Sequence, residues 1–510
     1  MAPRNAQPAA HAPRVPWADG VVIALLALGA VLLFARLGNG CLWQDEAETA
    51  LLARHTLRFG YPRATDGRNA IEIEPFGYGP GQSWIYSPWL PDYLLAGVFA
   101  LFGESTTAAR LPFAAAGWLS FLLAWRLAAC LTPDRVVHRL TVALLACSVP
   151  FLLHMRQCRY YALTTALILG VCLAALAYRA RPDRRAAAWL AGLLVLLFHA
   201  NFGAFMPTAA AVAAHHLLVR PQAAWRPAAI LGGCVAALTV PWALFFYRPG
   251  FVGAPSAARA IHHAEFYARV ANKYLVPMVF MLLVTLGRLL MRRRAPGPPV
   301  NRPAAQLIAL VVICTFAFLV FVPDQRHLRY LILVLPLLAM GEAWWLAGWW
   351  RRSRLVGGLV IALAVLTTVW HAPPPVRVPL VQFLDELTHA YTGPMDGVVA
   401  YLRAHGRPEE RVKIPYDDRT LMFYTDLRVE LPSRFLEDTD PDWIVMRRAW
   451  TPEAFYASPL FQRVETAYET IVLDAPDVQW QNREDPGEHH FRTVQGALPV
   501  VLYHKRRVGR

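Results

Sequence analysis

Residues 20–50 decide the fold, and they read GVVIALLALGAVLLFARLGNGCLWQDEAETA. The first half of this stretch is an unbroken apolar run, which predicts a helix that crosses a membrane. Two adjacent carboxylates, Asp45 and Glu46, follow shortly after the run. Ionisable residues near the hydrocarbon are costly, so a carboxylate pair at the mouth of such a helix points to a functional site. The alternative is that the pair only caps the next helix, because both residue types suit a first turn.

Composition extends the membrane prediction to the whole chain. Of the 510 residues, 56% are hydrophobic and 17% are charged, which is typical of a polytopic membrane protein with room for one soluble domain. The net charge of +15 comes mainly from arginines in short clusters between apolar runs, and no basic run is interleaved with aromatic residues. We therefore expect a lipid bilayer as partner and no nucleic acid. No cysteine pair has the spacing of a metal site.

Arginine clusters set the topology. The apolar runs predict about 11 spans, and with a cytoplasmic N-terminus every arginine-rich short loop then lies in the cytoplasm. That count leaves no crossing for the shorter apolar segment 90–102, which is expected to lie along the outer interface as an amphipathic helix. The expected spans are 19–36, 108–131, 137–153, 159–178, 186–200, 203–219, 227–247, 271–291, 304–322, 330–349 and 355–371.

Three regions follow from this topology. Residues 1–18 are rich in Ala, Pro and Arg and are expected to be a disordered cytoplasmic segment. Residues 19–371 form the transmembrane domain, with a large first extracytoplasmic loop at 37–107, and 372–510 form a small extracytoplasmic α/β domain. This domain is a candidate lid or acceptor-facing domain, or a structural support. Its expected elements are helices at 394–405 and 418–425 and strands at 411–415, 442–446 and 499–504.

The residues after the first span offer acid–base chemistry. If they are helical, Asp45, Glu48 and Thr49 share one face, because they are three and four residues apart, and Glu46 points elsewhere. One carboxylate of the group is a candidate catalytic base, with a second to orient it. Glu48 is a weak candidate for a metal ligand. Carboxylates beside a phosphate suit Mg²⁺ or Mn²⁺, although the sequence shows no clear ligand set.

Two basic and aromatic clusters lie on the same predicted outer face. Their guanidinium groups suit a phosphate, which they bind in a forked, bidentate way, and positive charge outside runs against the usual trend. The alternative is that these arginines only reach back to the interface. The candidate binding residues are Arg156, Arg159, Tyr160 and Tyr161, then Arg326, Arg329 and Tyr330, and in the first loop His55, Arg63 and Arg68.

A series of short motifs occurs in order along most of the chain. They are Asp45-Glu46, Gly60-Tyr61-Pro62, Ser87-Pro88-Trp89-Leu90, Ala109-Arg110-Leu111-Pro112, Arg159-Tyr160-Tyr161-Ala162-Leu163 and Arg329-Tyr330-Leu331. Together they resemble the GT-C class of membrane glycosyltransferases, in the branch of protein O-mannosyltransferases and aminoarabinose transferases.

This resemblance implies an inverting transfer of a monosaccharide from a polyprenyl-phosphate donor to a cell-envelope acceptor (glycan, lipid or protein). The reaction would take place on the outer face of a bacterial-type plasma membrane. Asp45 would act as general base, with Glu46 as the less certain partner, and Arg159 and Arg329 would hold the phosphate. Relatives that act on lipid A carry a Lys where Ser87 stands here, so phosphate binding by that loop would pass to Arg63 or Arg68.

The alternative function is a transporter or flippase of lipid-linked sugars. Such proteins show inverted repeats and broken helices with polar sites near the membrane midplane. The sequence has no internal repeat, and its polar candidates lie at the outer ends of the predicted spans. A scaffold that only binds a partner would not need the carboxylate pair or the outward arginines.

Overall fold

The computed structural model describes residues 19–72, 77–219, 225–247, 256–290, 298–369, 379–480, 482–483 and 485–506. The predicted disordered segment 1–18, the basic residues at 220 and 292–294, and residues 372–378 lie outside this range. The chain divides into two compact units. The first comprises Met1–Leu33, Ala115–Met155 and Tyr160–Val378, and the second Phe34–Ala114, Arg156–Arg159 and Pro379–Arg510. The domain boundaries expected from the sequence stay a prediction.

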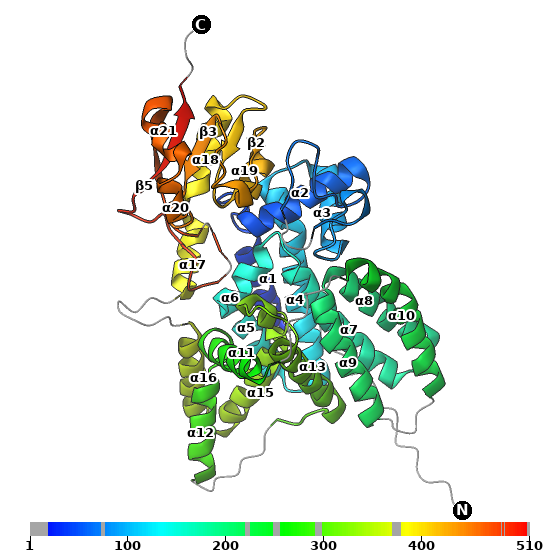
Figure 1. The fold of residues 1–510 in the computed structure, drawn as a ribbon. Coiled ribbons are helices and arrows are strands. Elements are labelled where there is room, and N and C mark those ends of the chain that lie inside the picture. The colour runs from blue at the N-terminus through cyan, green and yellow to red at the C-terminus, as the bar shows by residue number, and fades with distance from the viewer. Residues whose placement is uncertain are drawn as a thin grey trace, which may run out of the picture. The chain divides into compact units, whose positions relative to one another are not determined.

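Helices dominate the first unit (Figure 1). Among the described residues, four helices are long and apolar enough to cross a membrane, or up to six spans if each of two bent helix pairs is one span. The count of 11 spans therefore stays a prediction. The four helices are α4 (Thr106–Leu131), which begins in the second unit, α7 (Tyr161–Ala180), α10 (Trp225–Phe246) and α13 (Arg302–Phe321).

Prolines explain both bent pairs. The expected span 137–153 is divided into α5 (Arg135–Cys147) and α6 (Val149–Arg156), which meet at 69°. Pro150 in the first turn of α6 cannot continue the hydrogen bonds of α5. The expected span 271–291 is broken as well, at 83°. Val276 precedes Pro277 and is extended (φ −141°, ψ 130°), as a residue before proline prefers to be.

The segment between the expected spans 227–247 and 271–291 contains a helix, because α11 (Ala257–Val270) and the π-helical turn η2 (Ala271–Leu275) precede α12 (Met278–Leu290). The expected span 330–349 is divided into the short α14 (Leu328–Ile332) and α15 (Leu335–Arg352). The other helices of the first unit match the expected spans to within a few residues, and they are α1 (Gly20–Phe34), α8 (Arg184–Ala200), α9 (Phe202–Val219) and α16 (Arg354–Val369).

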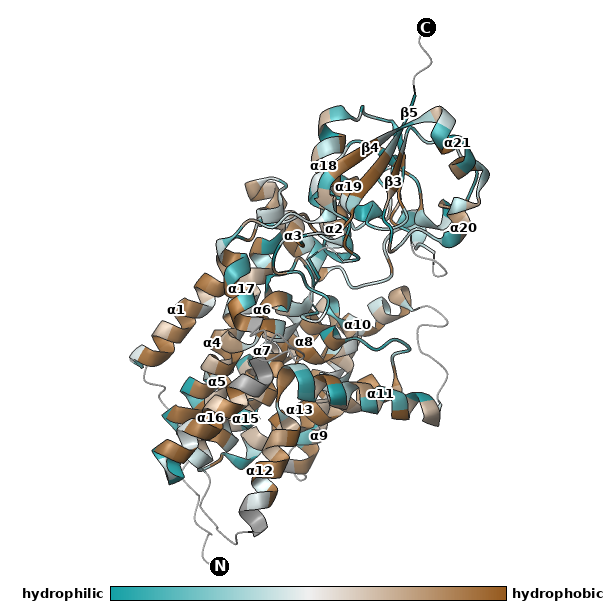
Figure 2. Cartoon of the chain, turned by 90° about the vertical axis from the view of Figure 1, so that its left-hand side faces the viewer, coloured by the Kyte–Doolittle hydropathy of each residue, from teal (hydrophilic) through white to brown (hydrophobic). Residues whose placement is uncertain are grey.

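Small residues let these helices pack closely. Helix α9 packs against α13, α15 against α5, and α7 against α8. A Cβ added at Gly117 would lie 2.7 Å from Cβ of Met155, so only glycine allows α4 and α6 to approach this closely. Figure 2 shows that the helices of the first unit are mainly hydrophobic along their length. Apolar helices of this kind are suited to a lipid environment.

The second unit contains the first loop and the C-terminal domain. In the loop, α2 (Gln44–Phe59) packs against α3 (Leu90–Phe102), the latter with the bounds expected from the sequence, and η1 (Pro80–Gln82) lies between them in the chain. Helix α2 ends at Gly60, whose φ of 83° is the left-handed conformation that glycine adopts without strain. Buried side chains lie on all faces of α2, which is unusual for a helix that carries several carboxylates.

The C-terminal domain is an α/β fold built on a five-stranded sheet with strand order β2-β1-β3-β5-β4. Strand β1 (Arg411–Lys413) is parallel to β2 (Arg428–Val429) and β3 (Trp443–Met446), and β5 (Pro499–Lys505) is antiparallel to β3 and β4 (Tyr468–Pro476). The side chains of β3 are all buried. The helices are α17 (Pro379–Thr388), α18 (Pro394–His405), α19 (Asp418–Tyr424), α20 (Glu453–Tyr456) and α21 (Pro459–Ala467).

A side chain from the first loop occupies one edge of this sheet. Asn69 accepts a hydrogen bond from the backbone N–H of Val429 (2.8 Å) and donates one to the carbonyl of Leu427 (3.0 Å). Its amide therefore pairs with β2 much as the backbone of a neighbouring strand would. Further contacts of the same loop, described below, join it to the C-terminal domain within one compact unit.

Candidate active site

Helix α2 carries the two adjacent carboxylates in its first turn, where the helix dipole favours negative charge. The carboxylate of Glu46 accepts a hydrogen bond from the backbone N–H of Trp43 (3.4 Å), the residue that precedes the helix. Glu46 therefore helps to cap the helix. The capping interpretation applies to this residue, while Asp45 lies one position earlier on another face.

Glu46 is fully buried and both of its oxygens have partners. The Arg110 guanidinium of α4 donates from Nε to Oε1 (2.8 Å) and from Nη2 to Oε2 (2.7 Å), a bidentate pair. The backbone N–H of Cys158 donates to Oε1 as well (2.9 Å). Arg110 also donates to the carbonyls of Leu37 and Asn39, both at 2.9 Å. This geometry gives Glu46 a structural role and lends no support to its predicted catalytic one.

A second cluster gathers on the other face of α2 around Arg159. Its Nη1 donates to Glu48 Oε1 (2.9 Å), to the carbonyl oxygen of Asp45 (2.9 Å) and to Thr49 Oγ1 (3.1 Å). Its Nη2 lies 3.6 Å from Asp45 Oδ2. The sequence prediction that Asp45, Glu48 and Thr49 share a face is confirmed by these contacts. Asp45 is the most accessible of the charged groups, with 20% of its side chain exposed, against 12% for Arg159 and 5% for Glu48.

Sequence reasoning missed the fourth charged member of this cluster. Arg419 of α19 donates from Nη1 to Glu48 Oε2, so Glu48 holds one guanidinium on each oxygen. Burial acts to lower the pKa of Arg419, but the charges of Glu48 and Asp418 raise it overall. The available signal was the charged run Asp417-Asp418-Arg419 before an apolar segment. A charged run at a helix start is also typical of a solvated surface, so the sequence alone could not place Arg419.

Asp418 belongs to the same contact between α2 and α19. Its Oδ1 accepts a hydrogen bond from Gln44 Nε2 (2.5 Å), and the side chain is almost fully buried. Burial raises the pKa of Asp418 above the usual range of a carboxyl, although Arg419 and the hydrogen bond from Gln44 act to lower it. The contact is therefore polar and water-poor, which strengthens each charge–charge interaction inside it.

Asp92 of α3 is a further carboxyl beside the cluster. Only 3% of this residue is exposed, and Oδ2 has no hydrogen-bond partner among the residues that the structure describes. Burial and the negative charge of Glu48 raise the pKa of Asp92 well above its usual range, which Arg159 only partly offsets. A raised pKa favours the neutral, protonated form of this carboxyl at pH values where an exposed Asp is ionised.

The other predicted residues of the first basic cluster divide between the units. Arg156 donates to the carbonyl of Ala35 (2.6 Å), and its guanidinium lies 5.4 Å from the Phe383 ring. Tyr160 and Tyr161 belong to the first unit. Their ring centroids are 4.7 Å apart, and Tyr161 is fully buried. Arg159 is the member of this cluster whose side chain forms ion pairs with Asp45 and Glu48 of α2.

The second basic cluster also belongs to the first unit. Arg326 lines an open cavity of about 620 Å³ and donates to the carbonyl of His262 (3.4 Å). The guanidinium of Arg329 lies 5.7 Å from the ring centroid of Tyr330. The other residues that line the cavity are Arg259, His263, Asp324, Gln325 and His327, together with His262. A binding role for Arg326, Arg329 and Tyr330 stays a prediction.

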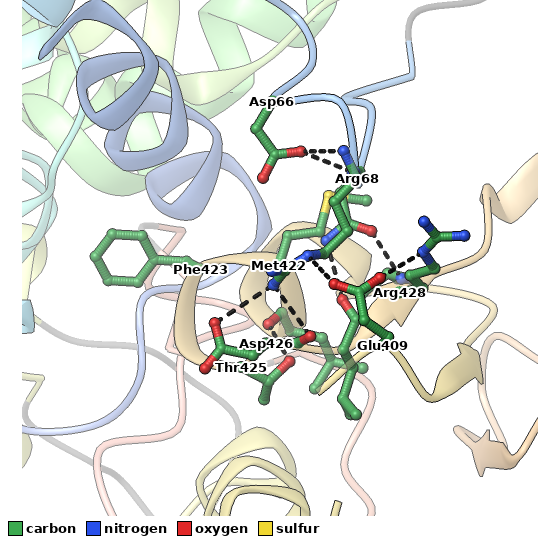
Figure 3. Close-up of polar contacts among 12 residues, drawn as sticks. Asp66, Arg68, Glu409, Met422, Phe423, Thr425, Asp426 and Arg428 are labelled. Carbon is green, nitrogen blue, oxygen red and sulfur yellow. Dashed lines mark hydrogen bonds and ion pairs between the residues drawn. The ribbon is translucent and has the colours of Figure 1, made fainter. Parts of the chain in front are cut away.

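The predicted binding residues of the first loop have contacts within the protein. His55 Nδ1 lies 2.6 Å from the carbonyl of Arg63, and burial lowers the pKa of His55, which favours the neutral ring. The Arg63 guanidinium lies 4.7 Å from the Phe59 ring. Arg68 forms an ion pair with Glu409 (2.9 Å) and donates to the carbonyl of Asp426 (3.1 Å), as Figure 3 shows. These contacts explain the loop's conformation and lend no support to phosphate binding.

Metal binding finds no support in this geometry. Both oxygens of Glu48, the predicted weak ligand, accept hydrogen bonds from guanidinium groups. Across the described part of the chain, no group of three or more His, Cys, Asp or Glu side chains is arranged to hold a metal ion. The cluster places the Asp45 carboxylate beside the Arg159 guanidinium.

Comparison with known proteins shows which solved structures have a similar fold. No protein-family model matches the chain, and neither does any curated protein. The fold is similar to that of ArnT from Cupriavidus metallidurans in the apo state, with a TM-score of 0.55 at 15% sequence identity over 95% of this chain and 98% of that chain. It is equally similar to ArnT bound to undecaprenyl phosphate, with a TM-score of 0.55 at 14% identity and the same coverage.

Two further solved structures share the fold. The Archaeoglobus fulgidus oligosaccharyltransferase in the apo form gives a TM-score of 0.51 at 12% identity over 91% of this chain and 75% of that chain. The mycobacterial arabinofuranosyltransferase AftD gives 0.51 at 16% identity, over 95% of this chain but only 40% of that chain. All are GT-C structures, so the resemblance inferred from the short motifs is confirmed at the level of the fold. With its apolar helices, the chain is a multi-pass membrane protein.

Proposed function

We propose that this protein is an inverting glycosyltransferase that moves a monosaccharide from a polyprenyl-phosphate donor to a cell-envelope acceptor. The observation that carries the proposal is the placement of Asp45 beside Arg159, with Glu48 and Thr49 fixing the guanidinium. It lies within a fold shared with ArnT, which was solved with undecaprenyl phosphate bound. A base next to a fixed positive charge suits the removal of a hydroxyl proton and the departure of a phosphate.

The reaction on this site needs few groups. Asp45 takes the proton from an acceptor hydroxyl as its oxygen forms a bond to the anomeric carbon of the sugar. The bond between that carbon and the phosphate oxygen of the donor breaks, and the lipid phosphate leaves with the electron pair. Arg159 stabilises the charge that grows on the leaving phosphate, and the configuration at the anomeric carbon inverts. The proton then passes from Asp45 to water, which restores the base.

The proposal includes the membrane topology of the protein. We place about 11 spans in a bacterial-type plasma membrane, with the first loop and the C-terminal domain on the extracytoplasmic side. The acceptor-facing domain then consists of the soluble part of the second unit. Asp45 follows α1 in the chain and lies on a helix of the first loop, which suits a base that must meet both a lipid-linked donor and a water-facing acceptor.

The test is Asp45→Asn in the full-length protein. We expect sugar transfer to fall by about 100- to 10,000-fold, the usual contribution of a general base, while binding of undecaprenyl phosphate stays within a few-fold of wild type. The measurement is transfer from a polyprenyl-phosphate sugar in vesicles, with binding of undecaprenyl phosphate followed separately. Asp474→Asn on the exposed face of β4 is the matched control, with transfer expected at the wild-type rate.

Two outcomes would count against the proposal. Wild-type turnover in Asp45→Asn would remove this residue as the base. Movement of a lipid-linked sugar across the vesicle membrane without any transfer would favour the transporter alternative.

A further inference from the structure

We propose that Arg419, which the C-terminal domain supplies, positions the phosphate-binding arginine of the site. Under this proposal the domain completes the site, beyond any role as a lid or a support. The inference rests on the proposed function, because it assigns a role to Arg419 through Arg159. Arg419 is a positioning residue in this scheme, since its contact is with Glu48.

The first step of the argument is the shared carboxylate. Glu48 Oε1 accepts from Arg159 Nη1 (2.9 Å), and Oε2 accepts from Arg419 Nη1. Glu48 is nearly fully buried, and the side chains of Arg159 and Arg419 are only 12% and 17% exposed. A buried carboxylate held on both oxygens has one orientation. Loss of one partner leaves a buried charge that is only half compensated, so the carboxylate must turn or take up water.

The second step links Glu48 to the position of Arg159. Arg159 Nη1 has three acceptors on one face of α2, and Glu48 is the charged side chain among them. The other two are the backbone carbonyl of Asp45 and the hydroxyl of Thr49, which are weaker acceptors for a guanidinium. The orientation of Arg159 therefore depends on Glu48, and that of Glu48 depends on Arg419.

The third step is the attachment of α19 to α2 at both ends. At the start of α19, Gln44 Nε2 donates to Asp418 Oδ1 (2.5 Å), and Thr420 Oγ1 donates to the carbonyl of Leu42 (2.9 Å). At its end, Arg54 donates to the carbonyl of Phe423 (2.8 Å), and the Arg54 guanidinium lies 4.5 Å from the Phe423 ring. These contacts fix the direction from which Arg419 reaches Glu48.

The first loop extends this attachment beyond the end of α19. Arg68 bridges Glu409 and Asp426, and Arg428 shares the same Glu409 carboxylate (2.7 Å) (Figure 3). The backbone N–H of Glu409 also donates to the carbonyl of Asp426 (3.3 Å). The chain that follows α19 is thereby tied to the loop that follows α2, so the helix that carries Arg419 is held at a constant register.

The experiment compares four variants of the full-length protein in vesicles, with undecaprenyl phosphate as the binding probe. Arg419→Met keeps the length of the side chain but removes the charge, and we expect its Kd for undecaprenyl phosphate to rise by about 10- to 100-fold, since small misplacements cost this much. Arg419→Lys should fall between wild type and Arg419→Met, because it restores the charge without the fork. Glu48→Gln should raise Kd similarly, and Glu48→Gln with Arg419→Met should add little more.

Controls separate positioning from folding and from the proposed function itself. Arg463→Ala removes an exposed arginine of the same domain, paired only with the exposed Asp438 among the contacts described, and should leave Kd unchanged. A wild-type Kd in a folded Arg419→Met would overturn the inference. If that variant does not fold, a wild-type Kd in Glu48→Gln overturns it instead. Arg159→Ala tests the proposed function: if it binds undecaprenyl phosphate like wild type, that function fails, whereas loss of binding in Arg159→Ala with a wild-type Kd in Arg419→Met rejects the inference alone.

Discussion

Position within one helical turn separates the roles of the carboxylates of α2. Asp45 and Glu46 are adjacent in sequence, so they differ by roughly 100° around the helix axis. Glu46 faces Arg110 and is fully buried, while Asp45 and Glu48 lie together with Arg159. The periodicity of the helix made this separation predictable from the sequence. Burial, which decides whether a carboxylate can meet a substrate, depends on Arg110, Cys158 and α19, and local sequence carries no signal for those partners.

Asp92 provides a pH test at the same scale. Its pKa is raised in the folded protein, so the folded state binds a proton that the unfolded state has lost at pH values above about 4. Stability should therefore fall as pH rises from that value toward the raised pKa. The amide in Asp92→Asn resembles the neutral carboxyl but does not titrate. We expect its Tm at pH 7 to equal or exceed that of wild type.

The measurement is Tm of both proteins from pH 5 to pH 8 in the same detergent. The difference between variant and wild type should grow with pH. A difference that stays constant over this range would show that Asp92 is already ionised in the folded protein.

At the scale of elements, the pairing of Arg110 with Glu46 joins α4 to the start of α2. The pair is bidentate and both side chains are almost fully buried. Arg110 lies in the first turns of α4, which continues from the second unit into the first.

The two bends could have been predicted from Pro150 and Pro277. The expected spans were instead drawn from hydropathy, which is averaged over a window and does not detect a single proline. In strand β4, exposed and buried residues alternate only from Val472 to Ala475, while Glu469 and Thr470 are both exposed, and its register became visible only beside β5.

Breaking this pair should destabilise the protein strongly. Glu46→Ala leaves the Arg110 guanidinium buried without its carboxylate, and we expect a loss of about 3–5 kcal/mol of stability. Unfolding in denaturant, followed by tryptophan fluorescence, measures the effect. Glu46→Gln, which keeps hydrogen-bond acceptors, should lose less. Transfer activity per folded molecule should change little in Glu46→Gln, and a loss as large as that of Asp45→Asn would instead assign Glu46 a catalytic role.

At the scale of the whole molecule, the first loop and the C-terminal segment share one compact unit, although Asn69 and Leu427, which contact each other there, are 358 residues apart in sequence. Sequence patterns predicted the GT-C resemblance, the α/β character of the C-terminal domain and most helices. They could not predict that unit, because its contacts join side chains such as Asn69 and Leu427 that lie far apart along the chain. The count of 11 spans was chosen because it places every arginine-rich short loop on the cytoplasmic side. Local hydropathy alone does not determine that count.

Shared membership of one unit makes a topological prediction. The first loop and the C-terminal domain must lie on the same side of the membrane, since their side chains are in direct contact. A periplasmic reporter fused after Arg506 should therefore be active. The same reporter inserted between α7 and α8, at Pro182, should be inactive, because that loop is basic and expected in the cytoplasm. Equal activity at both sites would contradict the proposed topology.

The amide of Asn69 affects whether the sheet can pair with a second copy of the protein. An edge strand with open hydrogen-bonding groups invites pairing with a strand of another molecule, and proteins commonly protect such edges. Asn69 occupies the groups of β2, so this side of the sheet is closed to a strand from a second copy. The opposite edge, β4, is instead discouraged from pairing by acidic side chains at Glu469 and Asp474 on its exposed face. Asn69 at one edge and the acidic side chains at the other thus both disfavour self-association through the sheet.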